Sequence, residues 1–286
     1  MPDGGGDVRV VDAHVHVWDP AALSYPWLEG DPLGSAHLPP EIDGASGGVD
    51  GWVFVEADAS AAPEVEADWV ASLEWPGLLG IVADAELDAS ALPARLDALR
   101  ARPLVRGVRH LLQGLDDERL ADPRLAEGLR RVAHEGLVFD ACVRWTQLEA
   151  LRRLVATAGV EGAPLVLDHL GKPPVGAGLG SQAGRDWLER MRALARVDGL
   201  AVKLSGLRAE APSAGVLRTE APGFLAAAID LFGPDRCLFG TDWPVSVGGD
   251  VTSEEWIGLV REAAGDGWPA VASGTATRVY GLDPVR

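Results

Sequence analysis

Near its amino terminus the chain reads VRVVDAHVHV over residues 8–17. The β-branched valines of this run favour a strand that is buried in a sheet. Because side chains alternate along a strand, His14 and His16 are predicted to point to the same face. Two buried imidazoles without partners would each cost about 1–3 kcal/mol. The pair therefore indicates a functional site at a strand end, while a half-exposed edge strand is the structural alternative.

Eight strand-like runs, including this one, recur along the chain, and apolar residues at helical spacing lie between most of them. The predicted strands are 8–17, 51–56, 78–84, 105–111, 137–143, 164–170, 200–205 and 236–242. The predicted helices are 87–102, 124–134, 146–158, 183–195, 224–232 and 253–264. Strands that alternate with helices indicate right-handed βαβ units and a parallel sheet.

Eight such units in about 250 residues predict an α/β fold, a single (β/α)8 barrel domain that spans residues 1–286. A doubly wound open sheet is the alternative, but no Gly-x-Gly-x-x-Gly turn follows the first strand. The long segment 20–50, which contains Tyr25-Pro26-Trp27, is predicted to be a loop that covers the substrate.

The composition limits the classes of partner. A net charge of −18 disfavours nucleic acid and anionic membranes, because both are polyanions. No apolar run approaches about 18 residues, so no transmembrane helix is expected. The two cysteines, Cys142 and Cys237, lie in apolar runs and are predicted to be buried free thiols. Residues 1–7 show no signal-peptide pattern, so we expect a cytoplasmic protein with a small-molecule substrate, and a homo-oligomer is left open.

Polar residues gather where the predicted strands end. In a (β/α)8 barrel this is the face that carries the chemistry. In strand order they are His14 and His16, Glu56 and Asp58, Asp84, Arg109 and His110, Asp140 and Arg144, Asp168, His169 and Lys172, Lys203 and Ser205, and Asp242 and Trp243. His169 and Asp242 follow apolar runs directly, so we predict functional roles for both.

Several of these residues also have a structural interpretation. Asp168 precedes His169 and is predicted to point to the opposite face of its strand, where it would make a structural hydrogen bond. Arg109 and His110 are adjacent, so only one is expected to face the barrel mouth, and we favour His110. Pairing with a neighbouring carboxylate is the alternative role for Lys203.

Acidic residues at strand ends can also cap the helix that follows, and this is the alternative role for Glu56 and Asp84. The two other histidines lie away from strand ends, His37 in the long loop and His134 on a predicted helix. Both are predicted to be solvated or locally hydrogen-bonded.

Six motifs in barrel order resemble the amidohydrolase superfamily, and within it the sugar-lactonase branch of the amidohydrolase-2 group, similar to L-fuconolactonase, L-rhamnonolactonase and pyrone-dicarboxylate lactonase. They are VDAHVHVW at 11–18, YPWL at 25–28, RGVRH at 106–110, LDHLGKP at 167–173, VKLSG at 202–206 and FGTDWP at 239–244. The resemblance implies a (β/α)8 fold and hydrolysis of a cyclic ester.

The chain departs from the two-metal members of that superfamily. Those members resemble one another in a bridging lysine on strand four and a histidine on strand five. Here strand four offers Arg109 and His110, and strand five has no histidine. A binuclear site is therefore not expected. The resemblance implies either no metal or one divalent ion, zinc or manganese, held by His14, His16 and Asp242.

The resemblance also suggests a catalytic or binding role for each residue. Asp242 is the candidate general base for water. His14 and His16 would polarise the carbonyl, directly or through a metal, and His169 would orient the water or assist the leaving group. The predicted substrate-binding residues are Trp27, Glu56, His110, Arg144, Lys172 and Trp243. A metal-dependent decarboxylase and a barrel that only binds its ligand are the alternative functions.

Overall fold

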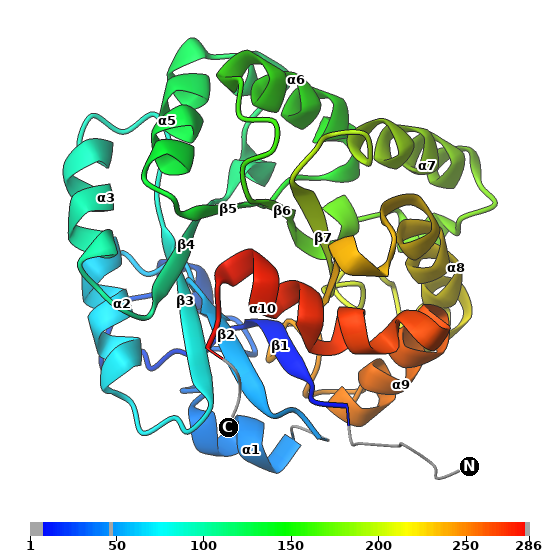
Figure 1. Ribbon diagram of the computed structural model, residues 1–286. Coiled ribbons are helices and arrows are strands. Elements are labelled where there is room, and N and C mark those ends of the chain that lie inside the picture. Colours follow the sequence, from blue (N-terminus) through cyan, green and yellow to red (C-terminus); the bar gives the residue numbers. More distant parts are fainter. Residues whose placement is uncertain (1–7, 46–47, 284–286) are drawn as a thin grey trace, which may run out of the picture.

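The computed structural model describes residues 8–45 and 48–283 and shows eight parallel strands in the order β1 to β8 (Figure 1). The strands are β1 Val11–Val15, β2 Gly51–Val55, β3 Leu78–Asp84, β4 Val105–His110, β5 Val138–Ala141, β6 Leu165–Leu167, β7 Leu200–Leu204 and β8 Cys237–Phe239. The ring closes beyond β8, where Val15 forms a parallel bridge with Trp243. Two backbone hydrogen bonds of 2.8 Å join the same segments. The predicted (β/α)8 barrel is confirmed.

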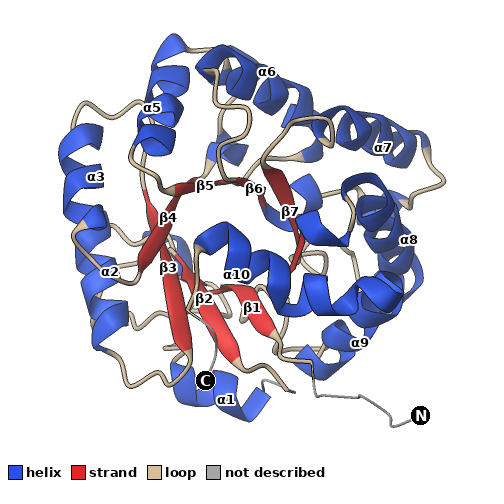
Figure 2. Cartoon of the chain, in the orientation of Figure 1, coloured by secondary structure: helices blue, strands red, loops and turns tan. Residues whose placement is uncertain are grey.

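Helices surround the ring of strands, except α10, which lies across the ring (Figure 2). They are α1 Pro39–Ala45, α2 Pro63–Ser72, α3 Leu92–Arg100, α4 Asp117–Leu120, α5 Pro123–His134, α6 Leu148–Ala158, α7 Gln182–Leu194, α8 Ala214–Phe232, α9 Ser253–Ala264 and α10 Thr275–Tyr280. Helices α1, α2, α4 and α10 were not predicted, and α1 lies within the segment 20–50 that was predicted to be a loop. Of the predicted helices, α8 differs most, because it begins ten residues before the predicted 224. Pro222 lies on the exposed side of α8 and does not end it, because Leu217 and Ala221 extend the buried stripe.

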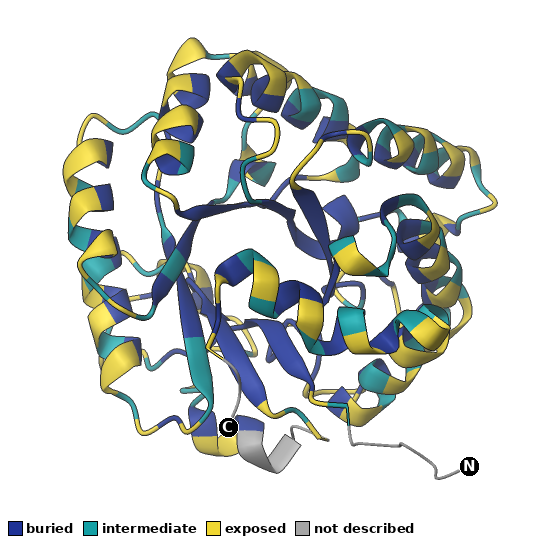
Figure 3. Ribbon diagram, viewed as in Figure 1, coloured by how far each residue is buried: buried dark blue, intermediate teal, exposed yellow. Residues whose placement is uncertain are grey.

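The strands are buried on both faces, as a closed parallel sheet requires (Figure 3). One apolar layer lies between the strands and the outer helices. A second fills the ring, where valines such as Val53 and Val82 belong to the same buried cluster as Tyr280 of α10. Helix α10 lies across the ring in Figure 1 and closes the end opposite the polar strand ends. Within residues 8–45 and 48–283, α10 therefore leaves the polar face as the open end of the barrel.

The structure also tests two smaller predictions. Cys142 and Cys237 are buried and unpaired, as predicted. His134 is 85% exposed, also as predicted. Across the described ranges 8–45 and 48–283, no helix is long and apolar enough to cross a membrane. Residues 1–7, on which the prediction of no signal peptide depends, lie outside the described residues.

Candidate active site

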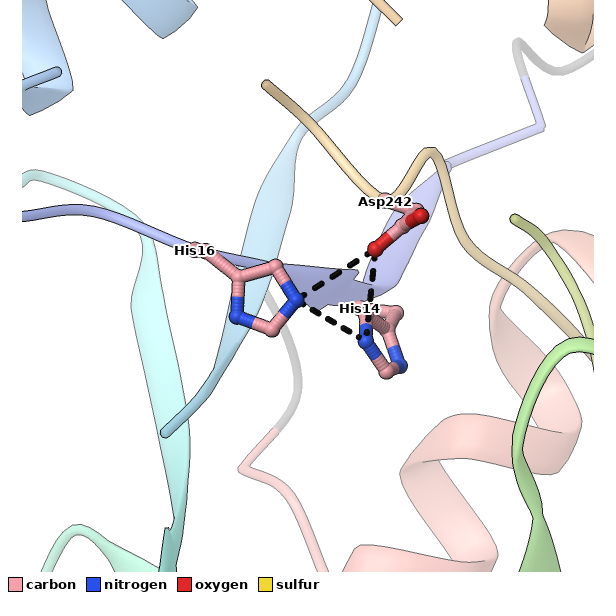
Figure 4. Close-up of side chains that lie close together, drawn as sticks. All are labelled: His14, His16 and Asp242. Carbon is pink, nitrogen blue, oxygen red and sulfur yellow. Dashed lines mark hydrogen bonds and ion pairs between the residues drawn. The ribbon is translucent and has the colours of Figure 1, made fainter. Parts of the chain in front are cut away.

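Three side chains converge at the polar end of the barrel, His14 and His16 from the end of β1 and Asp242 from the segment after β8 (Figure 4). The Nε2 atoms of the two histidines lie 3.2 Å apart. Asp242 Oδ1 lies 3.6 Å from Nε2 of His14 and 3.3 Å from Nε2 of His16. The prediction that both imidazoles point the same way is confirmed.

A buried carboxylate holds the backbone of this cluster in place. Asp12 Oδ1 accepts hydrogen bonds from the backbone N–H of His14 at 3.0 Å and of Thr241 at 2.9 Å. The strand register between β1 and β2 shifts between Asp12 and Val15, next to this contact. Asp242 has a positive φ of 58°, which few non-glycine residues adopt. Asp12 thus ties the two chain segments that carry the cluster to each other.

The donor atoms of the cluster fit one divalent ion. His16 Nδ1 lies 2.8 Å from the carbonyl oxygen of Val55, which can only accept, so His16 donates there and its Nε2 is a bare acceptor. For ligands at 2.0–2.1 Å from a tetrahedral zinc ion, ligand atoms are about 3.3 Å apart. The three separations in the cluster, 3.2, 3.3 and 3.6 Å, match that geometry. His14, His16 and Asp242 are therefore able to hold a single metal.

In a second group of possible metal ligands, a lysine side chain lies where a second ion would bind. His14, Asp168 and His169 also bring ligand atoms close together. Lys203 Nζ lies 3.1 Å from His14 Nδ1 and 3.1 Å from Asp168 Oδ1, so an ammonium group stands between two of these three residues. This arrangement supports one metal ion rather than two.

Asp242 is ionised. Burial alone would raise its pKa, but His169, His16 and His14 outweigh burial and hold the pKa far below its usual value. The hydroxyl of Ser246 donates a hydrogen bond of 2.7 Å to Oδ2, which leaves Oδ1 facing the histidines. The carboxylate is thus oriented for an ion or a water molecule on the Oδ1 side.

His169 approaches Asp242 Oδ1 from the other side of the barrel. Its Nε2 lies 3.9 Å from Asp242 Oδ1, and its Nδ1 lies 2.9 Å from the Ser205 hydroxyl. Burial lowers the pKa of His169 to about 4, so the imidazole is neutral at pH 7. Gly206 packs against the ring, and a Cβ there would lie 2.3 Å from Nδ1.

The expected orientation of Asp168, away from His169, is wrong. Strand β6 ends at Leu167, and His169 has a φ of 53°, so the alternation of a strand does not extend to this pair. Both side chains reach the centre of the barrel, and Asp168 Oδ1 lies 3.3 Å from His14 Nδ1. The fully buried Lys203 is paired, as its alternative role predicted, and its Nζ lies 2.5 Å from Asp140 Oδ2.

A cavity of about 280 Å³ lies above the cluster. Five of the predicted site residues line it, namely Trp27, His16, His169, Lys172 and Asp242. The predicted binding residues Glu56, His110, Arg144 and Trp243 are not among its lining residues. Trp243 is instead buried, with its ring centroid 5.6 Å from that of His37, and it borders a neighbouring hollow of about 620 Å³.

On strand β4 it is Arg109 that faces the cavity, and the preference for His110 is wrong. Arg109 donates to Glu56 Oε1 at 2.5 Å and to the Glu56 carbonyl oxygen at 2.7 Å. His110 Nδ1 instead accepts the backbone N–H of Leu87 at 3.3 Å. A buried guanidinium needs a carboxylate partner, and Glu56 supplies it from the end of β2, two strands away in the ring. Glu56 thus acts through Arg109 and does not cap a helix.

Sequence reasoning missed several residues that line the cavity. Gln113, Cys142 and Glu210 are on its wall, together with Asp58, which was noted only as a strand-end residue. Gln113 lies just beyond β4, and its position after a strand end was the available signal. Glu210 lies on the loop after β7, where no local pattern singles it out.

Comparison with known proteins identifies the family. The family model described as amidohydrolase matches residues 11–282. The chain belongs to the amidohydrolase family. This amidohydrolase is 33% identical over 245 residues to an L-fucono-1,5-lactonase of Burkholderia ambifaria, with 82% of this chain and 80% of the relative covered. It is 30% identical over 293 residues to an L-fucono-1,5-lactonase of Burkholderia multivorans, with 95% and 96% covered.

A solved structure gives a similar result. An amidohydrolase from Burkholderia multivorans, crystallised with bound zinc, superposes with a TM-score of 0.80 at 30% identity. The superposition covers 96% of this chain and 100% of that one. The family, this zinc-bound relative and the donor geometry of His14, His16 and Asp242 agree that the amidohydrolase is a hydrolase compatible with one metal ion.

Proposed function

We propose that this amidohydrolase opens a sugar lactone by hydrolysis. The observation that carries the proposal is the convergence of His14, His16, His169 and Asp242 on one point beneath a cavity of about 280 Å³. Opening a cyclic ester needs an activated water, a polarised carbonyl and a proton for the departing oxygen, and these residues can supply each. The names of the two curated relatives support the same chemistry.

Each residue has a role in that reaction. A metal held by His14, His16 and Asp242 would polarise the carbonyl and lower the pKa of water. Asp242 takes the proton from the water whose oxygen attacks the carbonyl carbon. In the tautomer in which the Ser205 hydroxyl donates to Nδ1 of His169, the ring proton is on Nε2. His169 delivers that proton to the ring oxygen as the C–O bond breaks and recovers one from Asp242. The product is a hydroxy acid.

The charges around the cavity favour a neutral polyhydroxylated substrate. Asp58, Glu210 and Asp242 line the cavity, against the cations Lys172 and Arg109. The charge of Arg109 is already matched by Glu56. Without a metal ion, an anionic lactone would therefore meet net repulsion, whereas hydroxyl groups can donate to the carboxylates. These features support a sugar lactone over a lactone that carries carboxylate groups.

A panel of five- and six-membered aldonolactones tests the proposal. Purified protein with zinc is mixed with each lactone, and the release of acid is followed with a pH indicator. We expect acid release well above the spontaneous rate for at least one neutral sugar lactone. Release of carbon dioxide from an aromatic carboxylic acid, with no lactone opened, would establish the decarboxylase alternative instead.

Replacing Trp27 with alanine should raise KM about tenfold while kcat changes little. The indole lines the cavity mouth at 38% exposure, and its Nε1 donates to the carbonyl oxygen of Ala57 at 2.8 Å. A fixed aromatic face at that place can stack on a sugar ring without touching the reacting atoms. Steady-state kinetics on the best lactone measure the effect, and an unchanged KM would contradict this role.

Replacing Gly206 with alanine should reduce kcat at least about tenfold, because the added Cβ would displace the His169 ring. Gly159 provides the matched control. It has a similar φ of 64°, against 73° at Gly206, but nothing lies within 4 Å of its Cβ position. Gly159→Ala should therefore bear the same backbone strain and keep its activity. Equal losses in the two variants would show that strain, rather than His169, is responsible.

We also infer a cytoplasmic location. The two buried, unpaired thiols Cys142 and Cys237 support it, because free cysteines persist in a reducing compartment. Association of two barrels through an apolar surface stays a prediction.

A further inference from the structure

The Nδ1 atom of His14 lies close to one hydrogen-bond donor and one hydrogen-bond acceptor. Lys203 Nζ, which can only donate a hydrogen bond, lies 3.1 Å away. Asp168 Oδ1, which accepts, lies 3.3 Å away. The side chains of His14, Asp168 and Lys203 are all fully buried. The protonation state of Nδ1 is therefore decided between these two neighbours rather than by solvent.

The other ring nitrogen of His14 faces the metal ligands of Figure 4. His14 Nε2 lies 3.2 Å from His16 Nε2, which is a bare acceptor because His16 Nδ1 donates to Val55. A proton on His14 Nε2 would be donated to His16. Without that proton, His14 Nε2, His16 Nε2 and Asp242 Oδ1 are three acceptor atoms that face one another, an arrangement that suits a cation.

His14 consequently has two tautomers, and each has an acceptor close to the nitrogen that carries the proton. With the proton on Nε2, the ring donates to His16 and accepts from Lys203. With the proton on Nδ1, the ring donates to Asp168 and its Nε2 becomes a ligand. The neighbours of the first state are at hydrogen-bond distance in the structure. Asp168 Oδ1 lies 3.3 Å from Nδ1 but has no hydrogen-bond partner among the described residues, so the ring must turn toward Asp168 when the proton moves to Nδ1.

We propose that Asp168 is a positioning residue that selects the ion-binding tautomer of His14, while Lys203 supports the ion-free one. Asp168 acts on the metal through His14 and does not line the cavity. Its own position is fixed by Lys203 at 3.1 Å and by Arg109 Nη1 at 3.6 Å. Carboxylates that orient a ligating histidine typically strengthen metal binding. The proposal concerns the metal site and holds whichever ester is hydrolysed, so its test is independent of the proposed function.

The wild-type protein provides the first test. Long-range ¹H–¹⁵N NMR spectra report which ring nitrogen of each histidine carries the proton, and a His14→Gln variant assigns the signals of His14. We expect Nε2–H in the chelator-treated protein and Nδ1–H after addition of Zn²⁺ alone. The same tautomer in both states, or a failure to bind Zn²⁺, would overturn the proposal.

Metal affinity provides the second test. Competition with a chromophoric chelator should show that Asp168→Asn raises the Kd for Zn²⁺ about 10–100-fold. Asp140→Asn is the matched control, because Asp140 is equally buried and also contacts Lys203, but the structure gives it no contact with His14. Its Kd should stay within about threefold of wild type. An equal loss of Zn²⁺ affinity in both variants, or no loss in Asp168→Asn, would contradict the proposal. If Asp168→Asn does not fold, the NMR spectra of the wild-type protein test the proposal instead.

Discussion

Asp242→Asn should reduce the hydrolysis of the preferred lactone about a thousandfold, which is the range for losing a positioned general base. Asp242 is 4% exposed, and its carboxylate faces three imidazoles at the bottom of the cavity. Asparagine has the same shape and can still accept the hydrogen bond from Ser246. We therefore expect a melting temperature close to that of wild type, measured by calorimetry alongside the pH-indicator assay.

A control variant and a Zn²⁺-binding measurement show whether the loss of activity comes from the loss of the general base. Asp230→Asn, on the exposed side of α8, changes the same charge far from the cavity and should leave kcat unchanged. Chelator competition for Zn²⁺ separates the two roles of Asp242, as base and as ligand. Activity that stays absent when Zn²⁺ saturates the variant assigns the base. Activity above about a tenth of wild type would rule that assignment out.

The barrel could be predicted from sequence because each parallel strand is buried on both faces and appears as a short apolar run. The same reasoning located His14, His16, His169 and Asp242, since strand ends of a barrel meet at one face. These predictions rest on periodicity and strand order, which are properties of the local sequence.

The errors occur where the local pattern stops. The orientation of Asp168 depends on the left-handed backbone of His169, which no strand period describes. Arg109 faces the cavity because Glu56, on another strand, neutralises it at 2.5 Å. Such pairings across the ring become visible only when the strands are brought together.

A second set of contacts between strands, centred on Lys203, lies between the site and the closed end of the barrel. Lys203 joins Asp168 and His14 at the cavity end to Asp140, whose carboxylate accepts a hydrogen bond from the Tyr280 hydroxyl of α10 at 2.8 Å. The cluster of His14, His16 and Asp242 and the closed end of the barrel are thus linked through one buried ammonium group. Its removal should affect stability more than the loss of any one side chain of that cluster.

Lys203→Met should lower the free energy of unfolding by about 3–5 kcal/mol, the usual cost of removing one member of a buried ion pair. Methionine fills a similar volume but leaves the carboxylates of Asp140 and Asp168, both fully buried, without their cation. Urea denaturation at pH 7 followed by tryptophan fluorescence measures the change. Arg218→Met is the control, because Arg218 makes an ion pair of the same 2.5 Å with Glu255 but is 48% exposed. That variant should differ little from wild type.

The pH dependence of Lys203→Met distinguishes lost charge from lost packing. Burial already raises the pKa of Asp140 to about 6 even beside Lys203, and removal of the ammonium raises it further. A carboxyl whose folded pKa exceeds its unfolded value stabilises the fold at low pH and loses that contribution as the pH rises through the folded pKa. The variant should therefore lose stability between pH 5 and pH 8 more steeply than wild type. A deficit that is constant over this range would mean that packing of the lysine stem, rather than its charge, is what the barrel requires.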